Sequence, residues 1–142
     1  MKPGVDFVGV GCGAFILNEK NEMLLLRRTK NSRNEAGTWA IPGGKIDFNE
    51  MAEQAITREM KEELDIDIQV EKFITYIDHI LPHEKQHWVS LVFKCKIVNG
   101  VVNNLEPHKN DRVEWFALGN LPKEKAVIFK LLLKKLKLLG IV

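Results

Sequence analysis

The chain has little cysteine and shows no pattern of cysteine spacing. Its 142 residues include two cysteines, Cys12 and Cys95, which lie far apart in the sequence. A disulfide-stapled scaffold or a zinc site would need more cysteines, or pairs at short spacing. The two residues fit buried thiols in a reducing compartment, and a single disulfide between them stays open as the alternative.

The chain also lacks a long apolar run and an excess of charge of one sign. No apolar stretch reaches membrane-spanning length, which requires about 20 residues. The apolar segment 7–17 could be mistaken for a secretion signal, but Asp6 and the interspersed glycines favour a strand. The formal net charge of +2 indicates neither a nucleic-acid-coating surface nor an acidic tail. We therefore expect a cytoplasmic protein with no nucleic-acid polymer and no membrane as partner.

The length and the order of elements predict a single domain over residues 1–142. This length is sufficient to bury a core without staples, and no linker, repeat or low-complexity segment divides the chain. We expect strands over 5–17, 23–28, 68–81, 87–98 and 113–116, a loop over 29–37 and helices over 50–64 and 122–139. The strands over 68–81 and 87–98 should form a hairpin, because the polar turn 82–85 joins them. Strands around one helix, with another to close, indicate an α/β layered domain with a mixed sheet.

The helix predicted over 50–64 is the most informative stretch. Pro42, Gly43 and Gly44 indicate a turn before it, and Asn49 is a good N-cap. Asp65 falls where the helix should end, at a position that often needs a left-handed backbone, which Asp tolerates at a cost of about 1 kcal/mol.

The same helix carries carboxylates on the face that begins with small apolar residues. At about 100° per residue, Ala52 and Ala55 lie within about 40° of Glu59 around the helix axis. Glu62 lies about 60° from Glu59 to one side and Glu63 about 40° to the other. Like charges at these spacings repel one another, and a hard divalent cation with oxygen ligands would offset the repulsion. A solvated acidic helix end explains the charge pattern equally well.

The residues around these glutamates resemble the Nudix box. Gly44 is followed after five residues by Glu50, and after seven more by Arg58-Glu59-Met60-Lys61-Glu62-Glu63-Leu64-Asp65-Ile66. Every defined position of the box matches except one, where the family has glycine and this chain has Asp65. A chance match over so many fixed positions in 23 residues is improbable.

The resemblance implies the Nudix fold, an α/β/α sandwich with a mixed sheet, over residues 5–139. It also implies that Glu59, Glu62 and Glu63 hold Mg²⁺, or alternatively Mn²⁺, with help from the backbone carbonyl of Gly43. Glu59 or another of these glutamates would act as general base, and Arg58 would clamp the carboxylates. The case for Glu50 as a site residue is weaker, because a favourable interaction with the helix dipole alone would explain a glutamate at that position.

Residues outside the three glutamates are open between a binding role and a structural one. Arg27, Arg28, Gly44 and Lys45 are candidates for contacts with the substrate, although a solvent-facing strand edge needs arginines as well. Trp39, Phe48 and Trp88 could stack on a base, yet large aromatics more often belong to the core. Glu106, Asp111 and Glu114 are unranked candidates for a further metal ligand. The four histidines show no ligand spacing, so we expect them to be surface or satisfied residues.

The activity implied by the resemblance is hydrolysis of a pyrophosphate bond in a nucleoside diphosphate linked to another group. Residues 104–110 and 114–116 look like MutT-type members, which favours nucleoside triphosphates. ADP-ribose and sugar nucleotides are the nearest alternative, and a non-catalytic nucleotide sensor and an isomerase are two further ones. The sequence leaves the oligomeric state open, although members of the family are often dimers. In a homodimer, the apolar helix over 126–139 would lie between the sheet and a partner subunit.

Overall fold

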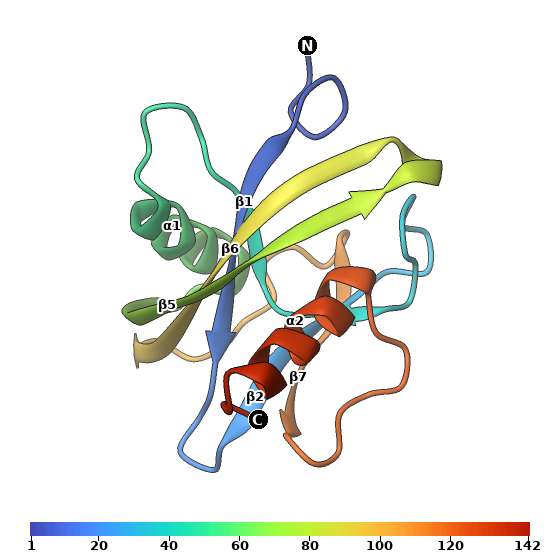
Figure 1. The fold of residues 1–142 in the computed structure, drawn as a ribbon. Coiled ribbons are helices and arrows are strands. Elements are labelled where there is room, and N and C mark those ends of the chain that lie inside the picture. The colour runs from blue at the N-terminus through green and yellow to red at the C-terminus, as the bar shows by residue number, and fades with distance from the viewer.

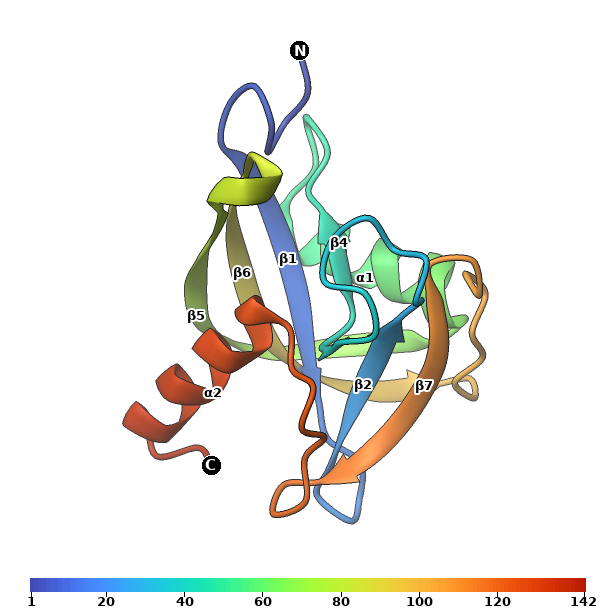
Figure 2. The ribbon, with the colours of Figure 1, turned by 90° about the vertical axis from the view of Figure 1, so that its right-hand side faces the viewer.

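The computed structural model describes all residues from Met1 to Val142. In chain order the elements are β1 (Gly9–Ile16), β2 (Glu22–Arg28), β3 (Trp39–Ala40), β4 (Gly43–Lys45), α1 (Ala52–Leu64), β5 (Asp67–Leu81), the short 3-10 helix η1 (Pro82–Glu84), β6 (Gln86–Asn99), β7 (Asn110–Ala117) and α2 (Val127–Leu138). The helices α1 and α2 lie on opposite sides of β1 (Figure 1 and Figure 2). The predicted α/β sandwich is therefore confirmed.

The strands form two sheets. The larger has the order β4-β1-β6-β5, in which β1 and β6 run parallel and the other pairs antiparallel. The smaller has the antiparallel order β3-β2-β7. The hairpin predicted around residues 82–85 is confirmed, with β5 and β6 paired from Asp67 opposite Asn99 to Leu81 opposite Gln86.

Strand β2 shows how the two sides of the sandwich are filled. Leu24 and Leu26 belong to the core under α1, whereas Met23 and Leu25 belong to the core under α2. A strand buried on both faces reads as a continuous apolar run, as this one does. Burying each large apolar side chain contributes about 1.5–3 kcal/mol. The helices supply the opposite walls of the two cores through Ala55, Ile56, Met60 and Leu64 of α1 and Phe129, Leu132 and Leu136 of α2.

Two predicted elements at glycines are corrected. The first strand begins at Gly9 rather than Val5, because the chain turns on itself before it, with the Gly4 N–H donating to the Phe7 carbonyl (2.7 Å). The glycines at 43 and 44 form no turn; they belong to β4, where Gly43 lies opposite Gly13 of β1.

The start of α1 also differs from the prediction. The helix begins at Ala52 with Met51 at the N-cap, and Asn49 has a left-handed backbone (φ +67°) outside it. The Gln54 side-chain oxygen accepts from the Met51 N–H (2.9 Å), so a residue inside the helix satisfies the N–H of the N-cap residue. Glu50 stays outside the helix, and one of its side-chain oxygens accepts from the Asp47 N–H (3.0 Å).

The start of α2 moves from Pro122 to Val127. Residues 124–126 are held extended by Trp39, whose N–H donates to the Glu124 carbonyl (2.8 Å) and whose carbonyl accepts from the Ala126 N–H (3.0 Å). The Val127 N–H then donates to Glu35 Oε1 (2.7 Å), a cap supplied from the loop between β2 and β3. No helix of the protein has both the length and the apolar character needed to cross a membrane.

The predictions for Asp65 and the cysteines are confirmed. Asp65 ends α1 with a left-handed backbone (φ +56°, ψ +38°), and its N–H donates to the Lys61 carbonyl (3.1 Å). Cys12 and Cys95 are buried free thiols.

The left-handed backbone at Asp65 gives the first testable prediction. Asp65→Ala and Asp65→Gly both remove the exposed ion pair with Lys61, so they differ mainly in the Cβ atom. We expect Asp65→Gly to have a free energy of unfolding about 1 kcal/mol larger than Asp65→Ala, because glycine adopts this backbone without steric cost. Urea unfolding at matched m-values measures the difference, and equal stabilities would mean that the left-handed cost is absent.

Candidate active site

The three glutamates of α1 lie at different depths. The Glu63 side chain is buried, with 6 % of the residue exposed, and its Oε1 atom has no hydrogen-bond partner. The Glu59 side chain is 15 % exposed and the Glu62 side chain 57 %. No group of three or more His, Cys, Asp or Glu side chains is gathered closely enough to hold a metal ion. The expected carboxylates thus lie on one helix, two of them shielded from water.

The Arg58 guanidinium links carboxylates of α1, Glu50 and the backbone of β4 by hydrogen bonds. It donates to both carboxylate oxygens of Glu50 (2.6 and 2.9 Å), and its Nη1 donates to Glu59 Oε1 (3.0 Å) and Glu62 Oε2 (3.1 Å). Its Nη2 also donates to the Lys45 carbonyl in β4 (3.1 Å). These bonds raise the pKa of Arg58 and hold the pKa of Glu50 down at about 2. Arg58 therefore fixes the orientation of Glu59 and Glu62 relative to β4.

The glycines of β4 leave room for the carboxylates. A Cβ atom at Gly44 would overlap the Glu59 carboxyl group, and one at Gly43 would overlap the Cys12 carbonyl oxygen. Only a residue without a side chain allows β4 to lie between β1 and α1 at this distance. The position of the Glu59 carboxyl group thus explains why residue 44 is glycine.

When they are ionised, the two shielded carboxyl groups carry negative charge that no protein cation fully offsets. Burial, followed by the charges of Glu106 and Glu59, raises the pKa of Glu63 to about 8. Burial is also the main cause that raises the pKa of Glu59. An unpartnered buried oxygen beside like charges fits a site for a hard divalent cation, which prefers carboxylate oxygens and would remove the repulsion.

Glu106 is the residue outside α1 that faces this charge. The Leu105 N–H donates to the Glu63 backbone carbonyl (3.0 Å), and the Asn103 N–H donates to the Leu64 carbonyl (3.0 Å), so the 103–106 segment is fastened to the end of α1. Glu106 is partly buried and lies 3.5 Å from Lys109 Nζ. The sequence placed Glu106 among three unranked candidates. The other two are engaged elsewhere, Asp111 with Arg27 and Glu114 with Arg112.

The carboxylates of Glu59 and Glu63 line a cleft of about 600 Å³. Glu59 and Glu63 lie in its wall beside the β4 glycines, and basic side chains line it as well. Those basic residues are Arg28, Lys45, His108 and Lys109. A cleft with acidic and basic side chains suits a ligand that carries both phosphate groups and a cation.

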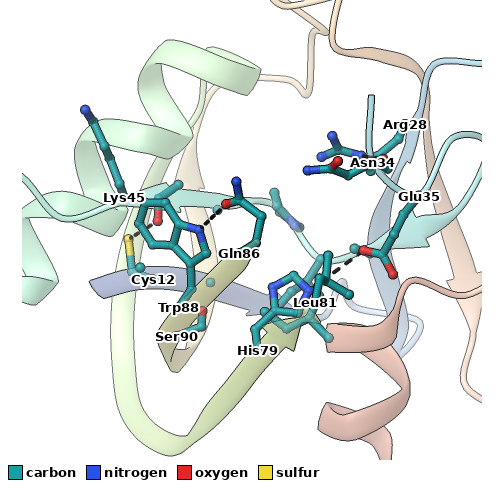
Figure 3. Close-up of a pocket in the computed structure, with 18 residues that line it drawn as sticks. Cys12, Arg28, Asn34, Glu35, Lys45, His79, Leu81, Gln86, Trp88 and Ser90 are labelled. Atoms are coloured by element: carbon teal, nitrogen blue, oxygen red, sulfur yellow. Dashed lines mark hydrogen bonds and ion pairs between the residues drawn. The ribbon is translucent and has the colours of Figure 1, made fainter. Parts of the chain in front are cut away.

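A second pocket, of about 370 Å³, adjoins the cleft on the α2 side of the sheet (Figure 3). The two cavities share a wall made of β3–β4 residues and Arg28; its members are Arg28, Ala40, Ile41, Gly43, Gly44 and Lys45. A ligand can therefore extend from one cavity into the other along this wall.

The predicted substrate contacts divide into two groups. Arg28, Gly44 and Lys45 line both cavities, whereas Arg27 lines neither of them. Arg27 donates from Nε and Nη2 to the two carboxylate oxygens of Asp111 (2.8 and 3.1 Å), and its guanidinium lies 5.9 Å from the Trp39 ring centre. The structure thus gives Arg27 partners at the protein surface.

The aromatic candidates also separate. Trp39 is a core residue with its ring edge-on to Phe116, and Trp88 lines the second pocket. Phe48 is 95 % exposed, so the expectation of a core position is wrong for it. His79, expected to be a surface or satisfied residue, instead lines the second pocket with its Nε2 buried and unpartnered. Its only sequence signal is the alternation of the hairpin strand, which turns it inward.

Comparison with known proteins finds one family, the NUDIX domain, over residues 8–135. An ADP-ribose pyrophosphatase of Methanocaldococcus jannaschii is 31 % identical over 108 residues, which are 76 % of this chain and 62 % of that protein. A MutT-like protein of Streptomyces ambofaciens is 26 % identical over 84 % of this chain and 71 % of its own length. The chain therefore spans less than two thirds of the archaeal relative.

Solved structures show the same fold at high similarity. A MutT NUDIX hydrolase from Burkholderia pseudomallei superimposes with a TM-score of 0.84 at 35 % identity, and the match covers 92 % of this chain and 98 % of that one. A MutT protein from Methanosarcina mazei gives a TM-score of 0.79 at 26 % identity, covering 94 % and 95 % of the two chains.

The raised pKa of Glu63 gives a prediction for the metal-free protein. Folded Glu63 keeps its proton up to a pH of about 8, whereas an ordinary glutamate loses it near 4.5, so the folded state holds the extra proton between these values. The stability that wild type loses as the pH rises through this window should be retained by Glu63→Gln, which cannot ionise. In chelator, we expect the free energy of unfolding of the variant relative to wild type to increase by on the order of 1 kcal/mol or more from pH 5 to pH 8.

Glu62→Gln is the matched control, because the Glu62 side chain is largely exposed and should show little of this change. Urea unfolding at several pH values provides the measurement. A relative stability of Glu63→Gln that does not vary with pH would contradict the burial of an uncompensated carboxylate.

Proposed function

The chain belongs to the Nudix hydrolase family, and from this we propose that it hydrolyses the pyrophosphate bond of a nucleoside triphosphate with the help of Mg²⁺. Water would attack one phosphorus atom of the anhydride between the α- and β-phosphates and form a new P–O bond, as the bond from that phosphorus to the bridging oxygen breaks. The products would be a nucleoside monophosphate and pyrophosphate. The observation that carries the proposal is the pair of shielded carboxylates, Glu59 and Glu63, against the glycines of β4.

Mg²⁺ would draw together carboxylate oxygens of Glu59, Glu62 and Glu63 and the Gly43 carbonyl, because without a cation no three such side chains are gathered closely enough to hold one. Glu106 is proposed as a further metal ligand, because its carboxylate is close enough to Glu59 and Glu63 for its charge to raise the pKa of both. When bound, the cation supplies charge neutralisation at phosphate oxygens, where negative charge gathers during substitution at phosphorus. The unpartnered Glu63 Oε1 supports a cation here.

Glu59 is proposed as the general base that receives the proton of the attacking water. Its pKa is raised by burial, which brings a carboxylate closer to the range useful for proton transfer near neutral pH. Arg58 would keep that carboxylate oriented through Nη1 and hold Glu62 with the same atom. Arg58 is therefore a positioning residue for both.

Arg28 and Lys45 are proposed to contact the phosphates, because both lie at the wall shared by the two cavities. Gly44 would let the phosphates approach the β4 backbone closely, since it has no side chain. Dimer formation, a cytoplasmic location and the lack of nucleic-acid or membrane partners stay predictions from the sequence.

ADP-ribose is the second candidate substrate, since a relative of 31 % identity is named an ADP-ribose pyrophosphatase. Its diphosphate would occupy the same cleft, and the two substrates differ in what extends beyond it. A direct assay separates them.

The hydrolysis prediction is tested on a panel of nucleoside triphosphates, ADP-ribose and sugar nucleotides. We expect turnover with Mg²⁺, none with chelator, and a loss of about 100-fold or more in kcat for Glu63→Gln and Glu59→Gln, because each removes a charge that the cation needs. Release of phosphate and pyrophosphate gives the rates. Glu19→Gln, in the exposed turn between β1 and β2, makes the same chemical change away from the site and should match wild type.

Turnover of ADP-ribose alone would replace nucleoside triphosphates as the substrate class. If wild type binds nucleotides but turns over no member of the panel, the chain is a nucleotide sensor and the hydrolase proposal is wrong.

Arg58→Lys tests the positioning role separately. Lysine keeps the positive charge but cannot reach Glu50, Glu59, Glu62 and the Lys45 carbonyl at once. We expect kcat to fall by about 10- to 100-fold with a smaller change in KM. A change confined to KM would instead indicate that Arg58 contacts the substrate.

A further inference from the structure

Glycines of β1 form part of the wall of the pocket beside the cleft. Gly9, Gly11 and Gly13 lie opposite Trp88, Ser90 and Val92 of β6, on the side of the sheet that faces α2. A Cβ atom at Gly9 would lie 2.6 Å from the Trp88 ring, so the indole occupies space that a side chain there would fill. Gly11 and Gly13 line the pocket. The sheet therefore presents a recess walled by a flat aromatic ring.

The hairpin side of the pocket offers an amide donor. The Trp88 indole N–H donates to Gln86 Oε1 (2.9 Å), which fixes the Gln86 amide and leaves its NH₂ group as the part able to donate further (Figure 3). An acceptor on a ligand beside the indole can take this bond.

The opposite side is formed by Glu35 and His79. Glu35 Oε1 accepts from the Val127 N–H, whereas Glu35 Oε2 lies 3.8 Å from His79 Nε2, beyond hydrogen-bond length (Figure 3). His79 Nε2 is buried with no partner. Burial lowers the pKa of His79, which favours the neutral imidazole with one donor and one acceptor. Glu35 Oε2 and His79 Nε2 can therefore both form hydrogen bonds with a ligand.

Loop residues hold this side in place. Glu35 has a left-handed backbone (φ +50°), and the Thr38 hydroxyl donates to its carbonyl (2.7 Å). The neighbouring Asn34 amide, turned so that its nitrogen meets acceptors, donates to Glu84 Oε2 at the hairpin tip (2.8 Å). The loop is thus tied both to the hairpin and, through Glu35, to the start of α2.

We infer that Glu35 and His79 read the edge of a nucleobase that presents adjacent N–H donors, with the base against Trp88 and its acceptor side towards Gln86. A carboxylate accepts hydrogen bonds only, so it requires a donor and is unfavourable beside a ring acceptor. Guanine has two adjacent donors on its Watson–Crick edge and acceptors at O6 and N7, whereas adenine places an acceptor between its amine and the rest of that edge.

The size and position of the pocket support a base rather than a second phosphate group. Its volume of about 370 Å³ is near the lower end of small-molecule sites, so it suits one ring system with its sugar. Glu35 would repel a phosphate, whereas Arg28 and Lys45, at the wall towards the cleft, would attract it. This inference rests on the proposed function for the ligand's phosphates and adds the group that sets its specificity.

The test uses nucleoside monophosphates as probes in chelator, so that binding is measured apart from hydrolysis. We expect GMP to bind wild type more tightly than IMP, AMP, CMP or UMP by calorimetry. Glu35→Gln keeps an oxygen for the Val127 N–H but replaces the second acceptor by a donor, so GMP affinity should fall by about 10- to 100-fold. Glu124→Gln removes an exposed carboxylate near the start of α2, outside the pocket, and should leave the order unchanged.

His79→Phe provides a second variant that retains a ring and removes both nitrogens. It should narrow the preference for GMP over AMP, and circular dichroism of each variant checks that it is folded. If neither variant changes the preference, or if wild type binds all five probes equally, the assignment of Glu35 and His79 is overturned.

Hydrolysis of the matching triphosphates keeps the two proposals distinguishable. Turnover of nucleoside triphosphates without a base preference would contradict the assignment of Glu35 and His79 to base recognition but would agree with the hydrolase proposal. Absence of any nucleotide turnover, with GMP still bound selectively, would do the opposite.

Discussion

The arrangement of this protein depends on placing carboxylates where water cannot fully solvate them. Glu59 and Glu63 project from α1 towards β4, and the backbone of that strand passes so close that Gly44 has no room for a side chain. Such a packing costs free energy unless positive charge is supplied. Arg58, in the same helix, supplies positive charge to Glu59. Glu63 Oε1 has no partner, and a bound cation would supply the positive charge that is missing there.

Local chemistry made the centre of the molecule predictable from the sequence. The glutamates of α1 follow from the helical period, and the left-handed end at Asp65 follows from its place after the last turn. The hairpin of β5 and β6 follows from two apolar runs around a polar turn. Each of these depends on residues within a few turns or on a direct neighbour in the sequence, so spacing carries the information.

Most of the features that were missed depend on residues distant in the sequence. Pro122 is a good first residue for a helix, yet pairing with Trp39 holds residues 124–126 extended. Asn49 is a good N-cap by residue type, but a left-handed backbone there leaves the cap to Met51. Glu106 could not be separated from Asp111 by spacing, because its place beside Glu63 arises from backbone bonds to the end of α1. Propensity gives way to tertiary contacts at Pro122 and Glu106, and to the local backbone conformation at Asn49.

The cap on α2 links parts of the chain that differ in what they do. A single side chain, Glu35, satisfies the first amide of the last helix and forms a wall of the pocket beside the cleft. Any substitution that shifts how α2 packs on the sheet also shifts that wall. Under the proposed function, the ligand preference could therefore drift through changes in a helix that touches neither the phosphates nor the carboxylates, which would give evolution a route to new substrates that leaves the proposed hydrolytic residues untouched.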